Sequence, residues 1–217
     1  LLKAKTVEAV VSAGNTGAVI AASMFAARLL PGVSRPGIAV VFPTILKTPT
    51  ILCDAGANIH CKPEHYLQYA VMASAYSHHV LGVEAPRVGL LNIGTEESKG
   101  STELRSIRQA LAQAADKLGT FSFVGAVEGN HIFEGEADVV VCDGFTGNTL
   151  LKSAEGASYA VVEHFASFMR EGEFSDVERA VLERAKTRLN EFTHYSEYGG
   201  APLLGINGCA IIAHGRS

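Results

Sequence analysis

Short turns rich in glycine, asparagine and threonine are the parts of this chain best suited to chemistry. The first is Gly14-Asn15-Thr16-Gly17, which follows the apolar run 7–11 and precedes a helix-like run. A strand that turns into a helix in this way leaves backbone N–H groups free at the helix start. Those groups and the helix dipole favour an anion, above all phosphate. We therefore expect Gly14, Asn15, Thr16 and Gly17 to bind phosphate.

Four more strand-like runs end in polar or glycine-rich turns, over residues 54–58, 93–100, 143–148 and 214–215. Loops beyond the carboxyl ends of parallel strands meet in one crevice, so we expect the five turns to form one site. Asn and Thr side chains donate hydrogen bonds there without adding negative charge. In these four turns we expect substrate to be bound by Asn58, Thr95 and Gly147, and the reaction to be catalysed by Lys99, Asn148 and His214.

Plainer roles stay open for the same side chains. An asparagine in a turn often caps a helix or closes the turn itself, which applies to Asn15, Asn58 and Asn148. The aspartates at two strand ends, Asp54 and Asp143, could accept hydrogen bonds, orient donors or hold a cation. Lys99 is the one cation within the turns. Its plainer role is that of an ordinary solvated lysine at the surface.

Composition excludes several classes of protein. The net charge of −4 disfavours nucleic-acid binding, which needs a basic field. No apolar run reaches the roughly 18 residues of a membrane span, and no signal peptide is visible, so we expect a cytoplasmic location. The length of 217 residues predicts one domain over 1–217, and the 47% of hydrophobic residues can supply its core. The charged residues, at 18%, are few for a soluble protein, so we expect part of the surface to be buried in an oligomer.

Motif searches exclude further chemistries. The chain lacks the G-x-S-x-G elbow of serine hydrolases, the P-loop and, after the first strand, the dinucleotide-binding G-x-G-x-x-G pattern. Its four cysteines include no C-x-x-C pair, which favours free thiols in a reducing compartment. A metal site at Cys53, His60 and Cys61 is an alternative. We expect neither a metal nor a cofactor.

The elements that must position these turns alternate along the chain. Strands are expected over 7–11, 38–42, 50–53, 88–92, 121–124, 139–142 and 209–213, and helices over 18–30, 63–79, 102–118 and 148–170. This order predicts a three-layer α/β/α fold with a mostly parallel sheet. Residues 149–194 differ, because a capping box at Ser175–Glu178 starts a second helix without an intervening strand. We expect a protruding helical hairpin that packs on the sheet or pairs across a dimer, with a tip that could touch a membrane.

The turns together resemble the bacterial phosphate acyltransferase family PlsX of phospholipid synthesis. The matching stretches are SAGNTGA (12–18), LCDAGAN (52–58), VGLLNIGTEESKG (88–100), CDGFTGN (142–148) and YGGAPLLGINGCAIIAHGRS (198–217). The family's Asp-x-Met-Gly-Gly-Asp motif and short C-terminal extension fall outside this sequence. We therefore expect the sequence to be part of a longer protein.

The resemblance implies a fold related to phosphotransacetylases and isocitrate dehydrogenases, a homodimer formed by the hairpin, and peripheral membrane contact. It also implies synthesis of acyl-phosphate from inorganic phosphate and fatty acyl-[acyl carrier protein], a product used by a downstream membrane acyltransferase. Candidate residues for docking the acidic carrier protein are Arg28, Arg35, Lys47, Arg105 and Arg108. Two alternatives stay open: a phosphotransacetylase-like enzyme acting on acyl-coenzyme A, and a non-catalytic scaffold attached to the membrane.

Overall fold

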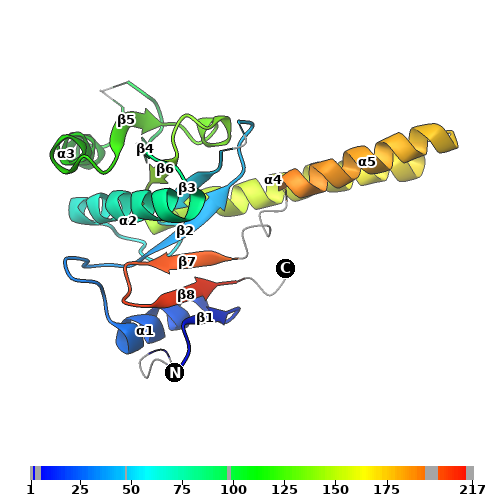
Figure 1. Ribbon diagram of the computed structural model, residues 1–217. Helices are drawn as coiled ribbons and strands as arrows, with labels where there is room; N and C mark the ends of the chain where they lie inside the picture. The colour runs from blue at the N-terminus through cyan, green and yellow to red at the C-terminus, as the bar shows by residue number, and fades with distance from the viewer. Residues whose placement is uncertain (1, 3–5, 47, 97–98, 194–199, 214–217) are drawn as a thin grey trace.

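The computed structural model describes residues 2, 6–46, 48–96, 99–193 and 200–213. In this part of the chain eight strands form one sheet in the order β1-β8-β7-β2-β3-β6-β4-β5, with helices on both faces (Figure 1). The strands are β1 (Ala9–Ser12), β2 (Gly37–Phe42), β3 (Thr50–Cys53), β4 (Arg87–Leu91), β5 (Ser122–Val127), β6 (Val139–Val141), β7 (Ala201–Leu204) and β8 (Cys209–Ile212). The helices are α1 (Thr16–Ala27), α2 (Pro63–Leu81), α3 (Thr102–Leu118), the short 3₁₀ helix η1 (His131–Glu134), α4 (Gly144–Glu171) and α5 (Asp176–Thr193).

Side-chain alternation along the central strands creates two cores, one on each face of the sheet. On β2, Ile38 and Phe42 pack in the core that includes Leu151 of α4, together with residues of α1. Ala39 and Val41 point the other way, into the core covered by α2 and α3. Successive strand residues face opposite sides of a sheet, so a strand buried on both faces is apolar throughout. The predicted three-layer α/β/α arrangement is confirmed.

Strand directions divide the sheet into two parts. The pairs β3/β6, β6/β4, β4/β5 and β1/β8 are parallel. The pairs β2/β3, β2/β7 and β7/β8 are antiparallel. Four of these seven pairs are parallel, in line with a mostly parallel sheet. Three successive reversals separate β1 and β8 from β3, so these two strands run opposite to β3, β6, β4 and β5.

Helix boundaries depend on their caps. Helix α3 spans the predicted residues 102–118, because the Ser101 side chain caps its start and Gly119, with φ 63°, ends it. Helix α1 starts at Thr16 and ends at Ala27, three residues before the predicted end, because Arg28 leaves helical geometry with φ 64°. Helix α4 starts four residues before the predicted position, because Asp143 caps it. Residues 144–147, expected as a turn, are its first turn.

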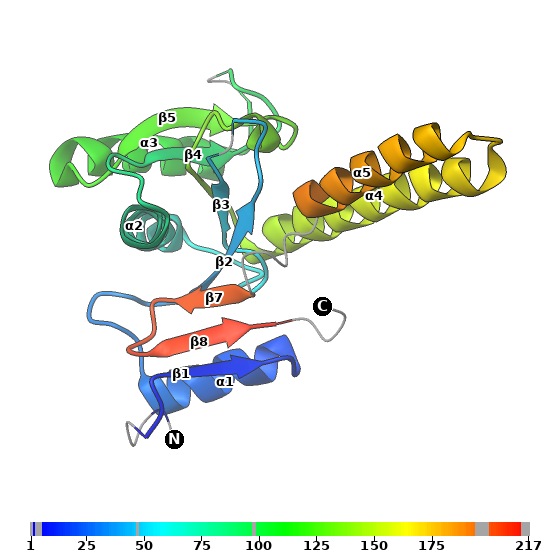
Figure 2. The ribbon, with the colours of Figure 1, turned by 45° about the vertical axis from the view of Figure 1, so that its right-hand side comes forward.

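Helices α4 and α5 form the expected hairpin, which extends away from the sheet (Figure 2). The capping box at its second helix is confirmed, since the Ser175 backbone N–H donates to the Glu178 carboxylate at 2.9 Å. The apolar residues of α5 differ in burial. Leu182 and Leu189 are half-buried, whereas Val177 is 75% and Val181 50% exposed. Among the described helices, none combines the length and apolar character that crossing a membrane would require.

Candidate functional site

The loop after β3 is built around the carboxylate of Asp54, which is fully buried. One carboxylate oxygen accepts hydrogen bonds from the backbone N–H groups of Ile38, Gly56 and Ala57 at 2.9–3.1 Å. The other oxygen accepts from the backbone N–H of Asn58 at 2.7 Å. Burial raises the pKa of the Asp54 carboxyl, and the hydrogen bonds from Ala57, Ile38 and Asn58 oppose that rise. The turn-acceptor role anticipated for Asp54 is therefore its observed role.

The side chain of Asn58 connects this loop to its surroundings. Its Nδ2 donates to the Pro36 carbonyl at 2.6 Å and to the Tyr69 hydroxyl at 2.8 Å, and lies 3.1 Å from the Asp54 carboxylate. An amide nitrogen carries two hydrogens, so this donor is fully used within the protein. The geometry favours a bracing role for Asn58 over donation to a bound phosphate.

The loop after β3 packs directly on the first turn of α4. The Gly144 backbone N–H donates to the Asn58 carbonyl at 2.8 Å. A Cβ atom on Gly144 would lie 2.7 Å from that carbonyl oxygen, and one on Gly147 would overlap the carbonyl of Asp54. Both positions therefore need glycine for close packing. The role of Gly147 here is to let α4 approach the loop.

Asn148 lies at the surface of this junction. Its side chain is exposed and passes over Gly56, whose hypothetical Cβ would be 3.6 Å from the Asn148 Oδ1. Gly56 has φ 133°, a conformation that side-chain-bearing residues rarely adopt. No hydrogen bond to the Asn148 amide occurs among the described residues. Asn148 is therefore a solvent-facing donor held over a rigid loop.

The turn after β4 carries Thr95 and Lys99, both of which are exposed. Asn92, directly after the strand, braces it by donating from Nδ2 to the Gly94 carbonyl at 3.1 Å and to the Lys99 carbonyl at 3.4 Å. The sequence analysis did not single out Asn92. The sequence predicts Asn92 as the last residue of the strand 88–92, and its place next to the polar turn was the available signal.

Arginines of α3 reach back over the same turn. Arg108 approaches the Thr95 carbonyl at 3.5 Å, and Arg105 approaches the Gly100 carbonyl at 3.3 Å. Both were candidates for docking an acidic partner. Three cations, Lys99, Arg105 and Arg108, therefore lie around this turn, together with the carboxylate of Glu96, which belongs to the turn itself.

The Gly14–Gly17 turn starts α1 as expected. Asn15 is the N-cap, and its Oδ1 accepts from the Ala18 N–H at 3.0 Å. The first turn of α1 contains no acidic residue. The start of α4, in contrast, is already capped by the Asp143 carboxylate, which accepts from Thr146 N and Oγ1 at 2.9 and 2.7 Å. Of these two helix starts, that of α1 suits an added anion better.

The five turns are not all brought together. Loops 54–58 and 143–148 are in contact, and the Lys99 turn follows β4, the neighbour of β6. The expectation of a single crevice assumed that every strand runs the same way, whereas β1 and β8 run opposite to the other strands concerned. Six strand spacings of about 4.8 Å separate β1 from β4 along the sheet. No hydrogen bond between described residues joins the 14–17 turn to the other turns. His214 lies outside the described residues.

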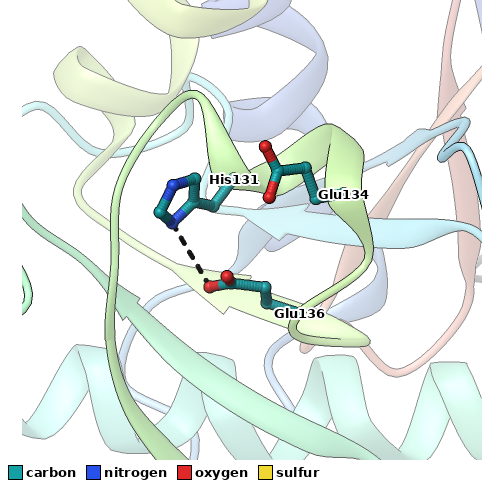
Figure 3. A group of neighbouring side chains, drawn as sticks. All are labelled: His131, Glu134 and Glu136. Atoms are coloured by element: carbon teal, nitrogen blue, oxygen red, sulfur yellow. Dashed lines mark ion pairs between the residues drawn. The ribbon is translucent and has the colours of Figure 1, made fainter.

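One group of side chains has the composition of a metal site. His131, Glu134 and Glu136 place their ligand atoms within 4.8 Å of one another, and His131 Nδ1 is 3.4 Å from the Glu136 carboxylate (Figure 3). Both glutamates are exposed, and exposed acidic groups commonly gather without an ion. We therefore assign no metal to this cluster.

The cysteines are free thiols, as expected. Cys53 and Cys142 are buried, and burial raises the pKa of both thiols well above the ordinary value. Within the described part of the chain, Cys53, His60 and Cys61 do not form a group of converging ligand atoms. The alternative of a metal site at these cysteines is not supported.

The fold is similar to that of solved acyl–phosphate transferases. A phosphotransacetylase from Streptococcus pyogenes aligns with a TM-score of 0.62 at 15% identity, over 98% of this chain and 59% of that protein. A branched-chain phosphotransacylase from Enterococcus faecalis aligns with a TM-score of 0.61 at 11% identity, over 99% of this chain and 69% of that protein. At these identities the likeness establishes the fold alone.

Comparison of the sequences establishes the family as well as the fold. A protein of Geobacter sulfurreducens named phosphate acyltransferase is 45% identical over all of this chain and 61% of its own length. A protein of Campylobacter concisus with the same name is 44% identical over all of this chain and 64% of its own length. The chain thus spans about three fifths of these relatives. A family model described as fatty acid synthesis protein matches residues 1–217, and the chain belongs to that family.

Proposed function

We propose that this chain is part of a phosphate acyltransferase, which makes acyl-phosphate from inorganic phosphate and fatty acyl-[acyl carrier protein] in phospholipid biosynthesis. The observation that carries the proposal is the 45% identity, over every residue of this chain, to a relative named phosphate acyltransferase. Because the chain spans 61% of that relative, the activity is proposed for the whole protein.

The proposed reaction is direct attack of phosphate on the thioester. A phosphate oxygen forms a bond to the carbonyl carbon, the carbonyl oxygen becomes an oxyanion, and the C–S bond then breaks. The thiolate of the carrier leaves and takes up a proton from solvent. Holding the two reactants together supplies several kcal/mol of the rate enhancement, and no serine or cysteine nucleophile is required.

The expected residues divide between two tasks. Asn15, Thr16 and the free N–H groups at the start of α1 hold phosphate, and Lys99 supplies positive charge. Because the strands that carry these turns lie six spacings apart in this chain, the reaction requires closure of the chain, or a second copy, to bring the turns to one substrate. Gly14 and Gly17 keep that backbone accessible, and Thr95 lies in the Lys99 turn. Asn148 and His214 donate to the oxyanion. The exposed amide of Asn148 supports this assignment, whereas the engaged amide of Asn58 gives it a bracing role.

The proposed dimer forms through the α4–α5 hairpin. No described residue of α5 is buried, and its outer face carries exposed Val177, Val181 and Phe192. Pairing with the hairpin of a second copy as a four-helix bundle would cover that face. At the tip, Phe168 is 52% exposed and packs edge-on against Phe174 at 5.2 Å. We propose that this tip touches the membrane surface, which places a cytoplasmic, peripherally attached enzyme beside the membrane acyltransferase that uses its product.

The direct test is to incubate the purified protein with long-chain acyl-[acyl carrier protein] and inorganic phosphate, and to measure acyl-phosphate by mass spectrometry. We expect a product whose formation requires phosphate. A parallel reaction with acyl-coenzyme A separates the carrier-dependent enzyme from a phosphotransacetylase-like one. Absence of phosphate-dependent product from a folded dimer would overturn the proposal in favour of the scaffold alternative.

A further inference from the structure

The carboxylate of Asp54 is fully buried, yet two more accessible parts of the proposed site are built on it, the half-buried loop 56–58 and the exposed Asn148. Its oxygens fix the backbone of Gly56 and Ala57 at 3.1 and 2.9 Å. Gly56 forms the surface over which Asn148 lies, with the Asn148 side chain 3.6 Å from its hypothetical Cβ. The conformation of this loop therefore determines the surface on which Asn148, the proposed oxyanion donor, lies.

A second connection runs through the first turn of α4. The Asn58 backbone, held by Asp54 at 2.7 Å, accepts the Gly144 N–H at 2.8 Å. The Asp54 carbonyl itself packs against Gly147, the residue before Asn148. The helix start that carries Asn148 therefore cannot shift without displacing the loop that Asp54 organises.

We propose that Asp54 is a positioning residue for acyl transfer, acting through Asn148. The proposal rests on the proposed function and adds a residue that cannot itself touch substrate. Asp54 orders loop 56–58 and the start of α4, and so holds the Asn148 amide in the orientation that meets the oxyanion. A misplaced donor loses much of its effect because stabilisation of a developing charge depends on preorganised geometry.

The substitution Asp54→Asn isolates this role, because it keeps size and shape. One carboxylate oxygen becomes an NH₂ group, and either orientation sets it against at least two existing donors. Those donors are the N–H groups of Ile38, Gly56 and Ala57 on one oxygen, and Asn58 N and Nδ2 on the other. A matched control is Asp138→Asn. The carboxylate of Asp138 is also buried, and it accepts hydrogen bonds from the backbone N–H and the guanidinium of Arg87 at 2.8–3.0 Å. Asp138 lies at the start of β6, whereas the loop that Asp54 organises packs beside the end of that strand.

The experiment measures kcat and KM for phosphate, with stability in urea, for Asp54→Asn, Asp138→Asn, Asn148→Ala and the Asp54→Asn/Asn148→Ala double variant. We expect Asp54→Asn to lower kcat by roughly tenfold or more relative to Asp138→Asn, with KM for phosphate changed by less than about threefold. Asn148→Ala should then cost less than about threefold when Asp54→Asn is already present, because the two residues act as one unit. Additive effects, or a kcat within about twofold of the control, would overturn the proposal.

Two further measurements test the proposal if Asp54→Asn does not fold or if the unmodified protein is inactive. If Asp54→Asn does not fold, Asn58→Ala removes the link from the loop to Pro36 and Tyr69, and the same cycle with Asn148→Ala applies. If the unmodified protein makes no acyl-phosphate, the proposed function has failed, and amide hydrogen exchange still tests positioning. We expect faster exchange over residues 144–148 in Asp54→Asn than in Asp138→Asn, and equal exchange would overturn the proposal.

Discussion

The carbonyl oxygen of Asp54 occupies the space that a side chain on Gly147 would need. Gly147→Ala must therefore push the start of α4 away from the loop after β3. We expect a loss of about 1–3 kcal/mol in the free energy of unfolding. Activity should fall as well, because Asn148 moves with the helix. Urea unfolding and the acyl-phosphate assay measure the two effects.

Gly156, farther along the same helix, is the matched control. A Cβ atom there meets nothing within 4 Å. Gly156→Ala should raise the free energy of unfolding by about 0.5–1 kcal/mol, because alanine loses less backbone entropy in a helix than glycine. Similar destabilisation by both substitutions would contradict the close packing at Gly147.

Asn15 has two roles to separate, since it caps α1 and is also a proposed phosphate ligand. Asn15→Asp keeps a good N-cap, so the stability should change by less than about 0.5 kcal/mol. The added negative charge should repel phosphate and raise its KM by roughly tenfold. Asn15→Ser keeps both the cap and neutrality and serves as the control. An unchanged KM in Asn15→Asp would leave Asn15 as a helix cap only.

Lys99 is exposed, and no ion pair to its side chain occurs among the described residues. Its removal should therefore leave the fold intact. Lys99→Ala is expected to cut turnover by about tenfold or more if its charge neutralises phosphate in the transition state. Lys117→Ala, an exposed change in the last turn of α3, is the control. Equal turnover in the two variants, at saturating phosphate and at low phosphate, would exclude Lys99 from the site.

The helices and strands whose ends were predicted correctly are those whose ends depend on neighbouring residues in the sequence. Helix α3 begins after a capping serine and ends at Gly119 in the left-handed region, so both of its ends are encoded by adjacent residues. The strand 50–53 was predicted with its observed ends for a similar reason, since a continuous apolar run suits a strand buried on both faces. Such features depend little on the rest of the chain.

Features set by distant segments were not predictable. Strand β7 was not among the expected strands, because its four residues include Pro202 and acquire strand character only by pairing with β2 and β8. That strand also sets the direction of β8 and β1, and with it the position of the Asn15 turn. The turn at Asn58 was found, but its engaged amide was not, because Pro36 and Tyr69 approach it only in the folded chain.

The exposed apolar face of α5 gives a prediction about assembly. Val181→Glu places a charge in the surface proposed to pair with a second copy, where Val181 is 50% exposed. Burying an unpaired carboxylate there should weaken the dimer by at least about 3 kcal/mol, roughly a hundredfold in dissociation constant. Sedimentation equilibrium measures that constant. Thr187→Glu, on another face of α5, should leave it unchanged, and a Val181→Glu dimer as tight as the control would argue against pairing through this face.

His65 should make the start of α2 sensitive to pH. The imidazole is buried, and its Nδ1 accepts the Lys62 backbone N–H at 3.1 Å, an interaction that only the neutral ring can make. Burial lowers the pKa of His65, Glu64 opposes this, and Arg35 and Lys62 add to it. Because the folded-state pKa lies below the unfolded value of about 6.5, the stabilisation is complete above that pH and is lost as pH falls through the folded-state pKa. In His65→Gln the side-chain oxygen can accept the same hydrogen bond at any pH. The melting temperature of the unmodified protein should therefore fall more than that of His65→Gln between pH 7 and pH 5, and parallel curves would show that His65 does not titrate in this way.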